Sequence, residues 1–388
     1  MSVEIVTPTE EMFPAIVAAD GQAFGITYTP EDVEAAAAMN DLERFRVALD
    51  GSDIVGIAGS FEKELTLPGG AIVSCTAVTW VSVAVTHRRR GLLRSLMEAV
   101  HDDGAARGEA VLALTASEGA IYQRFGYGVA TRYTVSSIDR RRTNVRDEYR
   151  PPHGSVRLVD PTAELDALVE RYDRYRRSQP GELSRDHTWI RELIRRWSPG
   201  LVVALHDDGY AAWKVKSQWH DGHPAHELTV LDLVAATDDA HAALWSTVLS
   251  VDLVGPVRSA GHVALDDPLR HLIEDPRALR TTELNDHLWL RPVDIAHCFG
   301  SRSYRLDDRL VIELDDQRWE VSADGCAATD AAADLVLQRP AAGTLLLGGI
   351  SASELARGRL LEARSESVLR RADAFFGWDP IAHCRTDF

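Results

Sequence analysis

A basic turn that joins a strand pattern to a helix pattern is the part of this sequence best suited to chemistry. The run VSVAVTHRRRGLLR (81–94) gathers four arginines around Gly91. A helix that begins right after such a turn presents unpaired N–H groups and the positive end of its dipole. Glycine also lets a ligand approach the backbone without a Cβ in the way. The turn therefore predicts a binding site for a diphosphate group.

The turn differs from two common phosphate-binding loops. It has neither the lysine and Ser/Thr of GxxxxGK[ST] nor the three-glycine pattern of dinucleotide-binding folds. A diphosphate bound without a metal ion fits these residues better. The alternative is that the four arginines form only a solvated basic face.

The segments on either side of the turn predict a mixed sheet with a helix packed on it. Apolar runs at 54–61, 71–85 and 110–117 have the residue types of strands. Between the second and third of these runs, apolar residues recur at helical spacing from Leu92 to Val100. The strand at 71–85 therefore leads into the basic turn, and the helix begins directly after it.

A break in this pattern divides the chain. Pro151, Pro152 and Gly154 stand among charged residues, and a helix cannot run through them. We expect a first domain over residues 1–150 and a second over 151–285, because the order of hairpin, strand and helix recurs after the break.

The remaining residues, 286–388, predict a separate α+β unit. Apolar runs at 309–315 and 344–349 predict strands, and the patterns at 351–361 and 366–376 predict short helices. The last dozen residues, GWDPIAHCRTDF, show no periodicity. They are either an exposed tail or a segment that docks elsewhere.

Length and composition exclude several classes of protein. With 388 residues, 45% hydrophobic and 26% charged, the chain is expected to fold into more than one domain. The formal charge of −17 argues against a nucleic-acid or anionic-membrane partner. It is compatible with a polycationic ligand, although a role in solubility explains it equally well. No run of 18 apolar residues is present and the N-terminus is acidic, so we expect a cytoplasmic protein without a signal peptide.

Metal and disulfide sites are not predicted. The four cysteines, Cys75, Cys298, Cys326 and Cys384, lack CxxC spacing, and the sequence has no secretory context. They are expected to be small buried side chains.

The basic turn resembles a known acetyl-CoA signature. Arg88 and Gly91 fit [QR]-x-x-G-x-[GA], the signature of the GNAT superfamily of N-acyltransferases, and Leu93 stands where glycine or alanine is usual. The longer motifs THRRRGLLR and TASEGAIYQRFGYG (115–128) are similar to those of one GNAT family, the enhanced-intracellular-survival (Eis) family of bacterial N-acetyltransferases. The resemblance continues through SVRLVDPT, LWLRPVDI and a chain that ends in phenylalanine.

This resemblance implies an α/β fold of mixed sheets in three parts. They are a GNAT domain, a GNAT-like domain without a cofactor site, and a sterol-carrier-protein-like domain. The residues agree on the second part, because Asp238 and Asp239 stand at the start of the helix that corresponds to the one after the basic turn. Two carboxylates there would repel a pyrophosphate. One acetyl-CoA per chain is expected, and no metal ion.

The resemblance also implies which residues hold acetyl-CoA. In GNAT enzymes the strand before the signature splays from its neighbour and donates backbone N–H groups to the acyl carbonyl and the pantetheine, and the signature holds the pyrophosphate. On this sequence the expected cofactor residues are Val81, Ser82 and Val83 in the strand, Arg89, Arg90, Gly91, Leu92, Leu93 and Arg94 in the signature, and Ser117 and Glu118 at the end of the next strand.

Two catalytic residues are implied in the same way. Tyr122 resembles the family's general acid, which protonates the departing thiolate. It could instead be a packed aromatic residue, or Tyr127 could take the role. Phe388 resembles the chain end whose free carboxylate serves as general base. The ordinary pKa of such a carboxyl, about 3.5, is low for this task unless burial raises it, and a disordered chain end is the alternative.

The resemblance finally implies a homohexamer that acts on a small polyamine such as an aminoglycoside. Phe24, Trp80 and Asp387 are candidates for the amine pocket, because aromatic faces and a carboxylate suit a polycation, although both aromatic residues could belong to the core. Two other functions stay open. They are acetylation of a lysine side chain in a protein or peptide, and binding of a lipid or sterol by the third domain.

Overall fold

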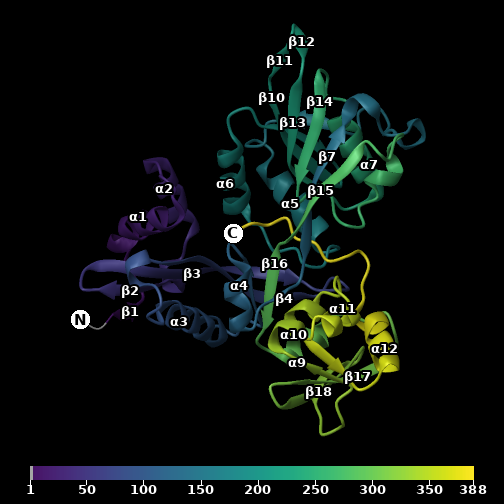
Figure 1. The fold of residues 1–388 in the computed structure, drawn as a ribbon. Coiled ribbons are helices and arrows are strands. Elements are labelled where there is room, and N and C mark those ends of the chain that lie inside the picture. Colours follow the sequence, from purple (N-terminus) through teal and green to yellow (C-terminus); the bar gives the residue numbers. More distant parts are fainter. Residues whose placement is uncertain (1–2) are drawn as a thin grey trace.

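Two large sheets and a smaller third sheet form the framework of the protein. The computed structural model describes residues 3–388, and Figure 1 shows the second sheet above the first and the third below it. The first sheet has the order β1 (Glu4–Val6), β2 (Arg46–Asp50), β3 (Asp53–Thr66), β4 (Ile72–Val83), β5 (Val111–Thr115), β16 (Leu288–Pro292) and β6 (Gly128–Val129). The second has the order β15 (Leu279–Asp286), β7 (Arg132–Asp139), β14 (Val254–Ala260), β13 (His226–Ala235), β10 (Gly209–Lys216), β9 (Val202–His206) and β8 (Arg157–Val159). The third has the order β19 (Gly325–Ala328), β18 (Gln317–Ser322), β17 (Arg309–Leu314), β20 (Leu335–Leu337) and β21 (Leu361–Ala363), and β11 (Trp219–His220) and β12 (His223–Pro224) form a separate hairpin.

Helices pack against these sheets. They are α1 (Phe13–Phe24), α2 (Pro30–Met39), α3 (Leu92–Ala106), α4 (Gly119–Tyr122), α5 (Leu165–Arg176), α6 (His187–Trp197), α7 (Asp238–Leu249), α8 (Leu269–Leu272), α9 (Ile295–Ser301), α10 (Arg339–Leu346), α11 (Ala352–Arg357) and α12 (Glu366–Phe376). None of the helices within residues 3–388 has the length and apolar composition needed to cross a bilayer.

Alternating side chains bury the two faces of the first sheet against different helices. In β2, Val47 packs in one cluster with Ile16 of α1, whereas the next residue, Ala48, packs in another cluster with Leu96 of α3. Because neighbouring residues of a strand point to opposite faces, α1 and α3 cover opposite faces of the sheet. The centre of the sheet is therefore covered on both faces, whereas the last residues of β4, 79–83, are only half-buried.

The second sheet repeats the order of the first. The first contains the hairpin β2–β3, then β4, then α3, and then β5 parallel to β4. The second contains the hairpin β9–β10, then β13, then α7, and then β14 parallel to β13. The predicted recurrence of hairpin, strand and helix is confirmed.

Each large sheet also takes a strand from outside its expected segment. β7 lies within residues 1–150 and yet pairs with β14 and β15 in the second sheet. β16 lies within 286–388 and inserts between β5 and β6 in the first sheet. The expected domain boundaries therefore do not separate the strands of the first sheet from those of the second. The reason is that sequence periodicity reports local conformation and does not report which strands pair.

The apolar run at 344–349 is not a strand, because its first half ends a helix and its second half is a turn, so the strand expected there was wrong. It overlaps α10, which has Pro340 in its first turn. A short apolar run cannot be distinguished from a buried helix by its periodicity alone. Gly343 lets α10 lie directly on the first sheet, since a Cβ there would lie 1.9 Å from the carbonyl oxygen of Leu290. The third unit and the first sheet consequently share one hydrophobic core.

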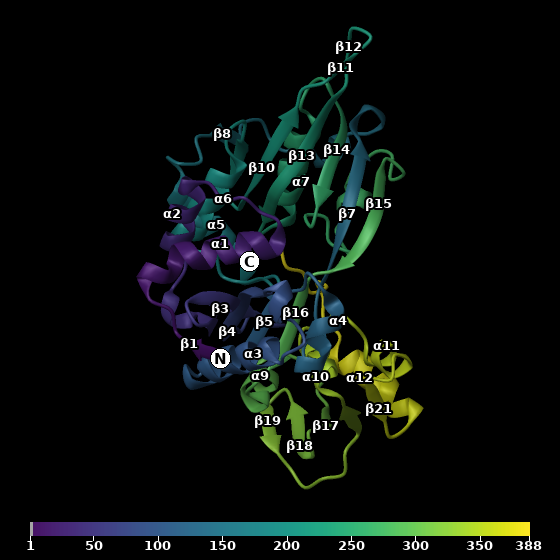
Figure 2. The ribbon, with the colours of Figure 1, turned by 60° about the vertical axis from the view of Figure 1, so that its left-hand side comes forward.

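The last residues, 377–388, leave α12 and run between the two large sheets (Figures 1 and 2). The N–H of His383 donates to the carbonyl oxygen of Pro180 at 2.9 Å. Arg185 Nε donates to Thr386 Oγ1 at 2.9 Å. The tail is docked, and the chain ends at the junction of the first two sheets.

Candidate active site

An opening separates β4 from β5. Within the described residues, parallel pairing joins the two strands only at 75–77 and 111–113, whereas β4 stays paired with β3 as far as Val83. On the side that faces β5, the backbone groups between Val78 and Val83 therefore have no strand partner in the described chain. Unpaired N–H and C=O groups of this kind are available to a ligand.

A β-bulge in β4 lies at this opening. Between the paired positions 57/82 and 59/79, two residues of β4, Trp80 and Val81, stand opposite Ala58 alone. Trp80 takes a φ of 54°, which places a bulky residue in a costly left-handed conformation. Bulges bend a strand and re-aim its side chains. The strand-end residues expected to hold the acyl group thus lie where the backbone departs from regular pairing.

Three aromatic rings surround the side chain of Trp80. Its ring centroid lies 6.3 Å from Phe13, 6.4 Å from Tyr28 and 5.9 Å from Phe45, and the Tyr28 ring is stacked on it. Trp80 remains partly exposed and lines a pocket. It is therefore a fixed wall of a binding site as well as a neighbour of the core.

Most donors of the basic turn have no partner within residues 3–388, although Arg88 Nε donates to the carbonyl oxygen of Val83 at 3.4 Å. Arg89 and Gly91 have φ values of 64° and 84°, and α3 begins without a side-chain cap and without an acidic residue in its first turn. His87 Nε2 of this turn is hydrogen-bonded to Asp50 Oδ2 at 3.1 Å, and within residues 3–388 the arginines of the turn form no ion pair. A Cβ at Gly91 would meet no atom within 4 Å, so its left-handed φ, and not crowding, favours glycine.

These elements surround a cleft of about 940 Å³. Every expected cofactor residue lines it except Arg90. Tyr122, Phe24 and Arg88 line it as well. The structure thus brings together the strand end, the basic turn and the residues that follow β5. Across residues 3–388 there is no group of three or more His, Cys, Asp or Glu side chains placed to hold a metal ion.

α7, the helix of the second sheet that corresponds to α3, does not offer its N-terminus to an anion. Thr237 Oγ1 accepts a hydrogen bond from the N–H of Ala240 at 3.2 Å, which caps α7. Asp238 and Asp239 lie in the first turn of this helix. A capped N-terminus with two carboxylates repels a pyrophosphate, whereas the start of α3 attracts one.

The two tyrosines that the sequence left as alternatives have different surroundings. Tyr122 ends α4 and lines the cleft, whereas Tyr127 is fully buried with its hydroxyl 2.9 Å from His101 Nε2. Burial, with a contribution from the charge of Glu118, raises the pKa of Tyr122 above its ordinary value. Its phenol is therefore protonated in neutral solution, and Tyr127 is a core residue.

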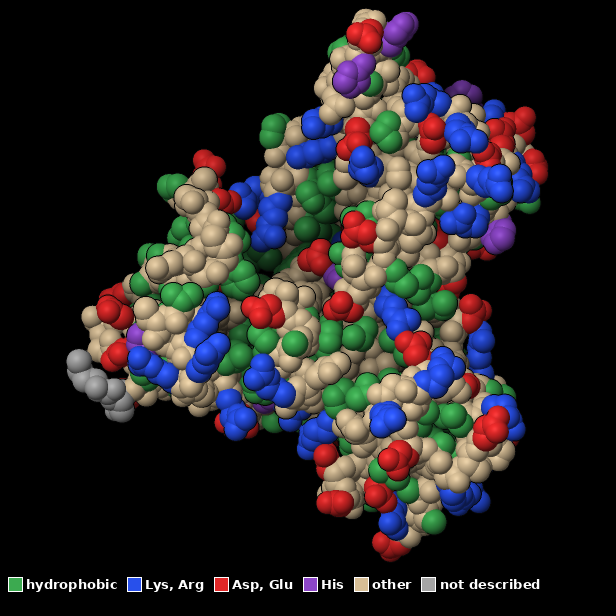
Figure 3. Space-filling view, viewed as in Figure 1, with side chains coloured by type: hydrophobic (Ala, Val, Ile, Leu, Met, Phe, Trp, Pro, Cys, Tyr) green, Lys and Arg blue, Asp and Glu red, His purple; other side chains and the backbone are tan. Residues whose placement is uncertain are grey.

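A second pocket, of about 600 Å³, adjoins the cleft, and Phe24 lines both. Figure 3 shows the surface hollowed where the parts that carry the first and second sheets meet. Trp80, Asp387 and Phe388 line this acceptor pocket, as we name it. All three residues expected in the amine pocket therefore lie around one cavity together with the chain end.

Sequence reasoning missed the other charged residues of the acceptor pocket. Arg195 on α6 donates to Asp32 on α2 at 3.0 Å. Glu192 accepts from Arg195 and from Arg196, both at 2.7 Å. These ion pairs tie α2 to α6 and balance two arginines with two carboxylates. The Asp32–Arg195 pair spans 163 residues of sequence, so no local pattern could have revealed it.

Buried polar groups hold the chain end beside the acceptor pocket. Thr115 Oγ1 donates to the backbone oxygen of Phe388 at 3.3 Å. Glu182, which is completely buried, accepts from the N–H of Arg385 at 3.1 Å. The end of the chain is therefore fixed by contacts with both large sheets and their loops.

Comparisons with known proteins match this architecture in three consecutive parts. Family profiles described as an acetyltransferase (GNAT) domain match residues 4–130 and 181–292. A profile described as a sterol carrier protein domain matches residues 299–385. The expected fold of two GNAT units followed by a sterol-carrier-like unit is confirmed.

Two curated relatives share one name. N-acetyltransferase Eis of Mycobacterium tuberculosis is 35% identical over 401 aligned positions, which cover 98% of each chain. The protein of the same name from Mycobacterium bovis has the same identity and coverage. The chain belongs to the Eis family of N-acetyltransferases. It is therefore an acetyltransferase, and the resemblance drawn from its motifs is confirmed.

Solved structures agree with membership of the Eis family. The crystal structure of Eis1 from Mycobacterium abscessus is 32% identical, has a TM-score of 0.90 and matches over the full length of both chains. A GCN5-related N-acetyltransferase from Kribbella flavida, 20% identical with a TM-score of 0.82 over 100% of this chain and 98% of that one, shares the fold.

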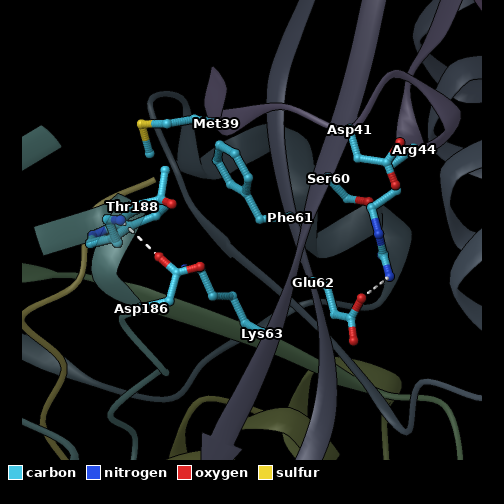
Figure 4. A pocket seen from close by; sticks show the side chains of 10 residues that line it. Met39, Asp41, Arg44, Ser60, Phe61, Glu62, Lys63, Asp186 and Thr188 are labelled. Carbon is cyan, nitrogen blue, oxygen red and sulfur yellow. Dashed lines mark hydrogen bonds and ion pairs between the residues drawn. The ribbon is translucent and has the colours of Figure 1, made fainter. Parts of the chain in front are cut away.

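A smaller cavity of this Eis-family chain holds a buried lysine (Figure 4). The cavity measures about 180 Å³ and shares Met39, Phe61 and Trp189 with the acceptor pocket. Lys63 is 6% exposed, and its Nζ lies 3.6 Å from the centroid of the Trp189 ring. Burial, only partly offset by the nearby charge of Asp186, lowers the pKa of Lys63 to about 8.

Lys63→Met is expected to stabilise the Eis-family chain at neutral pH. The folded pKa of about 8 lies below the ordinary 10.5, so the charged amine opposes folding below about pH 8, and this effect disappears as the pH rises to about 10.5. The substitution should raise the free energy of unfolding at pH 7 by about 2 kcal/mol, after the lost contact with Trp189 is subtracted. Guanidinium denaturation at pH 7 and pH 10 measures the difference. Lys216→Met, at an exposed lysine, is the control, and a Lys63 variant less stable than wild type at pH 7 contradicts the prediction.

Proposed function

We propose that the chain transfers an acetyl group from acetyl-CoA to an amine of a small polyamine, such as an aminoglycoside. One observation carries the proposal. The cleft beside the basic turn and the pocket that holds the terminal carboxylate meet at Phe24, which lines both. Direct transfer to an amine requires a donor site and an acceptor site side by side, with a proton acceptor at the amine.

The cleft has donors that suit acetyl-CoA. The unpaired backbone of residues 81–83 would bind the acyl carbonyl and the pantetheine, since backbone N–H groups stabilise an oxygen that gains negative charge. The uncapped start of α3, with Arg89 and Arg94, would bind the pyrophosphate. Ser117 and Glu118 would line the far side of the cofactor. Acetyl-CoA supplies the acetyl group as a thioester.

Two groups of the chain would move protons in this reaction. Tyr122 would donate its phenol proton to the departing thiolate, and burial helps to keep that phenol protonated by raising its pKa. The carboxylate of Phe388 would accept the proton of the attacking amine. The ordinary pKa of a chain-terminal carboxyl is about 3.5 and that of an alkylammonium about 10. Desolvation of both groups by the bound acceptor would favour their neutral forms and so bring the two values together.

The lining of the acceptor pocket supports a polyamine as acceptor. Aromatic faces and excess negative charge both attract ammonium groups. Its carboxylates are those of Asp20, Asp32, Glu192, Asp387 and the chain end, against the two guanidinium groups of Arg195 and Arg196, and its aromatic residues are Phe24, Tyr28, Phe61, Trp80, Trp189 and Phe388.

Release of CoA from acetyl-CoA in the presence of aminoglycosides and linear polyamines tests the proposal. Untagged protein, or protein tagged at its N-terminus, keeps the carboxylate of Phe388 free. We expect turnover that depends on both acetyl-CoA and a polyamine. Turnover with lysine peptides alone would assign the chain to protein or peptide acetylation instead. Binding of acetyl-CoA without turnover on any amine would contradict the acceptor class.

The proposal includes assembly as a homohexamer and action in the cytoplasm, both of which the family resemblance implies. Light scattering after size-exclusion chromatography measures the first. If the protein is an active monomer at the concentration of the activity assay, catalysis does not require the hexamer.

A further inference from the structure

Asp20 is a buried carboxylate in the wall of the acceptor pocket. It lies on α1, and 5% of its surface is exposed. The hydroxyl of Tyr28 donates to its Oδ2 at 2.7 Å, and the Tyr28 ring stacks on Trp80. Within residues 3–388, its other oxygen, Oδ1, accepts no hydrogen bond and the carboxylate forms no salt bridge. One oxygen of Asp20 therefore remains free for a ligand in the pocket.

This arrangement opposes folding and needs an explanation. A carboxylate taken out of water without a cation is unfavourable, and burial raises the pKa of Asp20, although the hydrogen bond from Tyr28 lowers it in part. The other buried acid of the pocket, Glu192, is paired with Arg195 and Arg196. Asp20 therefore differs from Glu192, because no group of the described chain neutralises it.

The charges around Asp20 leave room for a cation. Tyr28 lies on the loop after α1, Asp32 on α2, Glu192, Arg195 and Arg196 on α6, and Asp387 and the terminal carboxylate on the tail. Both arginines are engaged by Asp32 and Glu192. Within residues 3–388, Asp20, Asp387 and the chain end have no guanidinium partner, and Asp387 lies 3.6 Å from His287 Nε2. The pocket can therefore take at least one positive charge at Asp20 in addition to the reacting amine.

We infer that Asp20 binds a second ammonium group of the acceptor, distinct from the amine that reacts at the terminal carboxylate. The inference rests on the proposed function and narrows it to diamines and polyamines. The ammonium would donate a charge-assisted hydrogen bond to Oδ1 and lie against the rings of Tyr28 and Trp80. Tyr28 holds the carboxylate in place for this contact, so Tyr28 is a positioning residue.

Asp20→Asn tests the inference, because it removes the charge and keeps the shape and the hydrogen bond from Tyr28. CoA release is measured with linear diamines of three to eight carbons and with the monoamines of the same length. At pH 8 we expect the KM of the best diamine to rise at least ~10-fold, the size of a lost charge-assisted hydrogen bond. Its kcat and the KM of the monoamine should change less than about twofold. Asp53→Asn, at an exposed carboxylate outside the pocket, is the matched control.

The pH profile and a second variant separate binding from a structural role. In wild type the KM of the diamine should rise as the pH falls through the raised pKa of Asp20, and this dependence should be absent from Asp20→Asn. Tyr28→Phe removes a hydrogen bond that lowers this pKa, so the rise should begin at a higher pH. Removing an unpaired buried charge should leave the melting temperature unchanged or higher.

The other possible results of these assays each contradict one statement made above. Equal changes in KM for diamines and monoamines would make Asp20 a structural residue. An unchanged KM for diamines would refute the ammonium site and leave the proposed acetyl transfer standing. If wild type turned over no amine, the proposed function would fail. Calorimetric binding of the diamines to wild type and to Asp20→Asn would still decide the ammonium site.

Discussion

Addition of one glycine after Phe388 is expected to lower kcat at least ~100-fold while acetyl-CoA still binds. The extension converts the carboxylate of Phe388 into a neutral peptide carbonyl, which cannot accept the amine proton, and moves the free carboxylate one residue further along the chain, away from its position at the pocket. A general base contributes about 100- to 10,000-fold to such reactions. The buried contacts of Arg385 and Thr386 lie before the change, so the tail should stay docked. CoA release with a polyamine and the melting temperature measure the two effects separately.

The same residue added elsewhere serves as the control for this experiment. A glycine at the N-terminus lengthens the chain equally and should leave kcat within about twofold of wild type. Phe388→Leu keeps a terminal carboxylate and removes the aromatic ring, so it should retain far more activity than the extended chain. Full activity of the extended chain would show that another group, or water, takes the proton.

Tyr122→Phe is expected to lower kcat at least ~100-fold and to change the affinity for acetyl-CoA less than about threefold, because it deletes one proton donor and little packing. The raised pKa of Tyr122 also fixes the expected pH profile. An acid works in its protonated form, so loss of the Tyr122 proton should not limit the rate below pH 10. Steady-state rates from pH 6 to pH 10 and direct binding of acetyl-CoA provide these measurements.

Tyr127→Phe is the matched control for Tyr122→Phe. Its hydroxyl is buried against His101 and lies outside the cleft. Its loss should destabilise the fold by about 1–3 kcal/mol, because His101 loses a buried partner. The kcat should remain near that of wild type. If Tyr127→Phe lost turnover and Tyr122→Phe kept it, the general acid would have been assigned to the wrong tyrosine.

The cleft beside the basic turn could be predicted from the sequence because its parts are neighbours along the chain. Residues 81–94 contain the strand end, the basic turn and the helix start, and a local pattern reports such a series. The acceptor pocket could be predicted only in part. Its walls come from α1, α2, β3, β4, α6 and the tail, and residues such as Glu192 have ordinary helical surroundings in the sequence. Their meeting depends on tertiary packing.

The fold shows the same division between local and long-range information. The recurring order of elements was predicted, because each element leaves a local periodicity in the sequence. The exchange of β7 and β16 between the expected segments was not predicted, because pairing partners leave no local signal. The run at 344–349 was assigned to a strand because the helix that it ends, α10, is buried. A buried helix lacks the polar positions that mark helical spacing in a sequence.

The place of β16 in the first sheet sets an order for biosynthesis. β5 lies between β4 and β16, so one of its edges stays open until residue 292 has left the ribosome. The N-terminal unit therefore cannot complete its sheet from its own residues, and until β16 is added the open edge of β5 is a site for pairing with other chains. Asp387 and Phe388 follow β16 in the chain, so this part of the acceptor pocket is added later still. A chain released early from the ribosome lacks this wall of the pocket, whatever the quality of its fold.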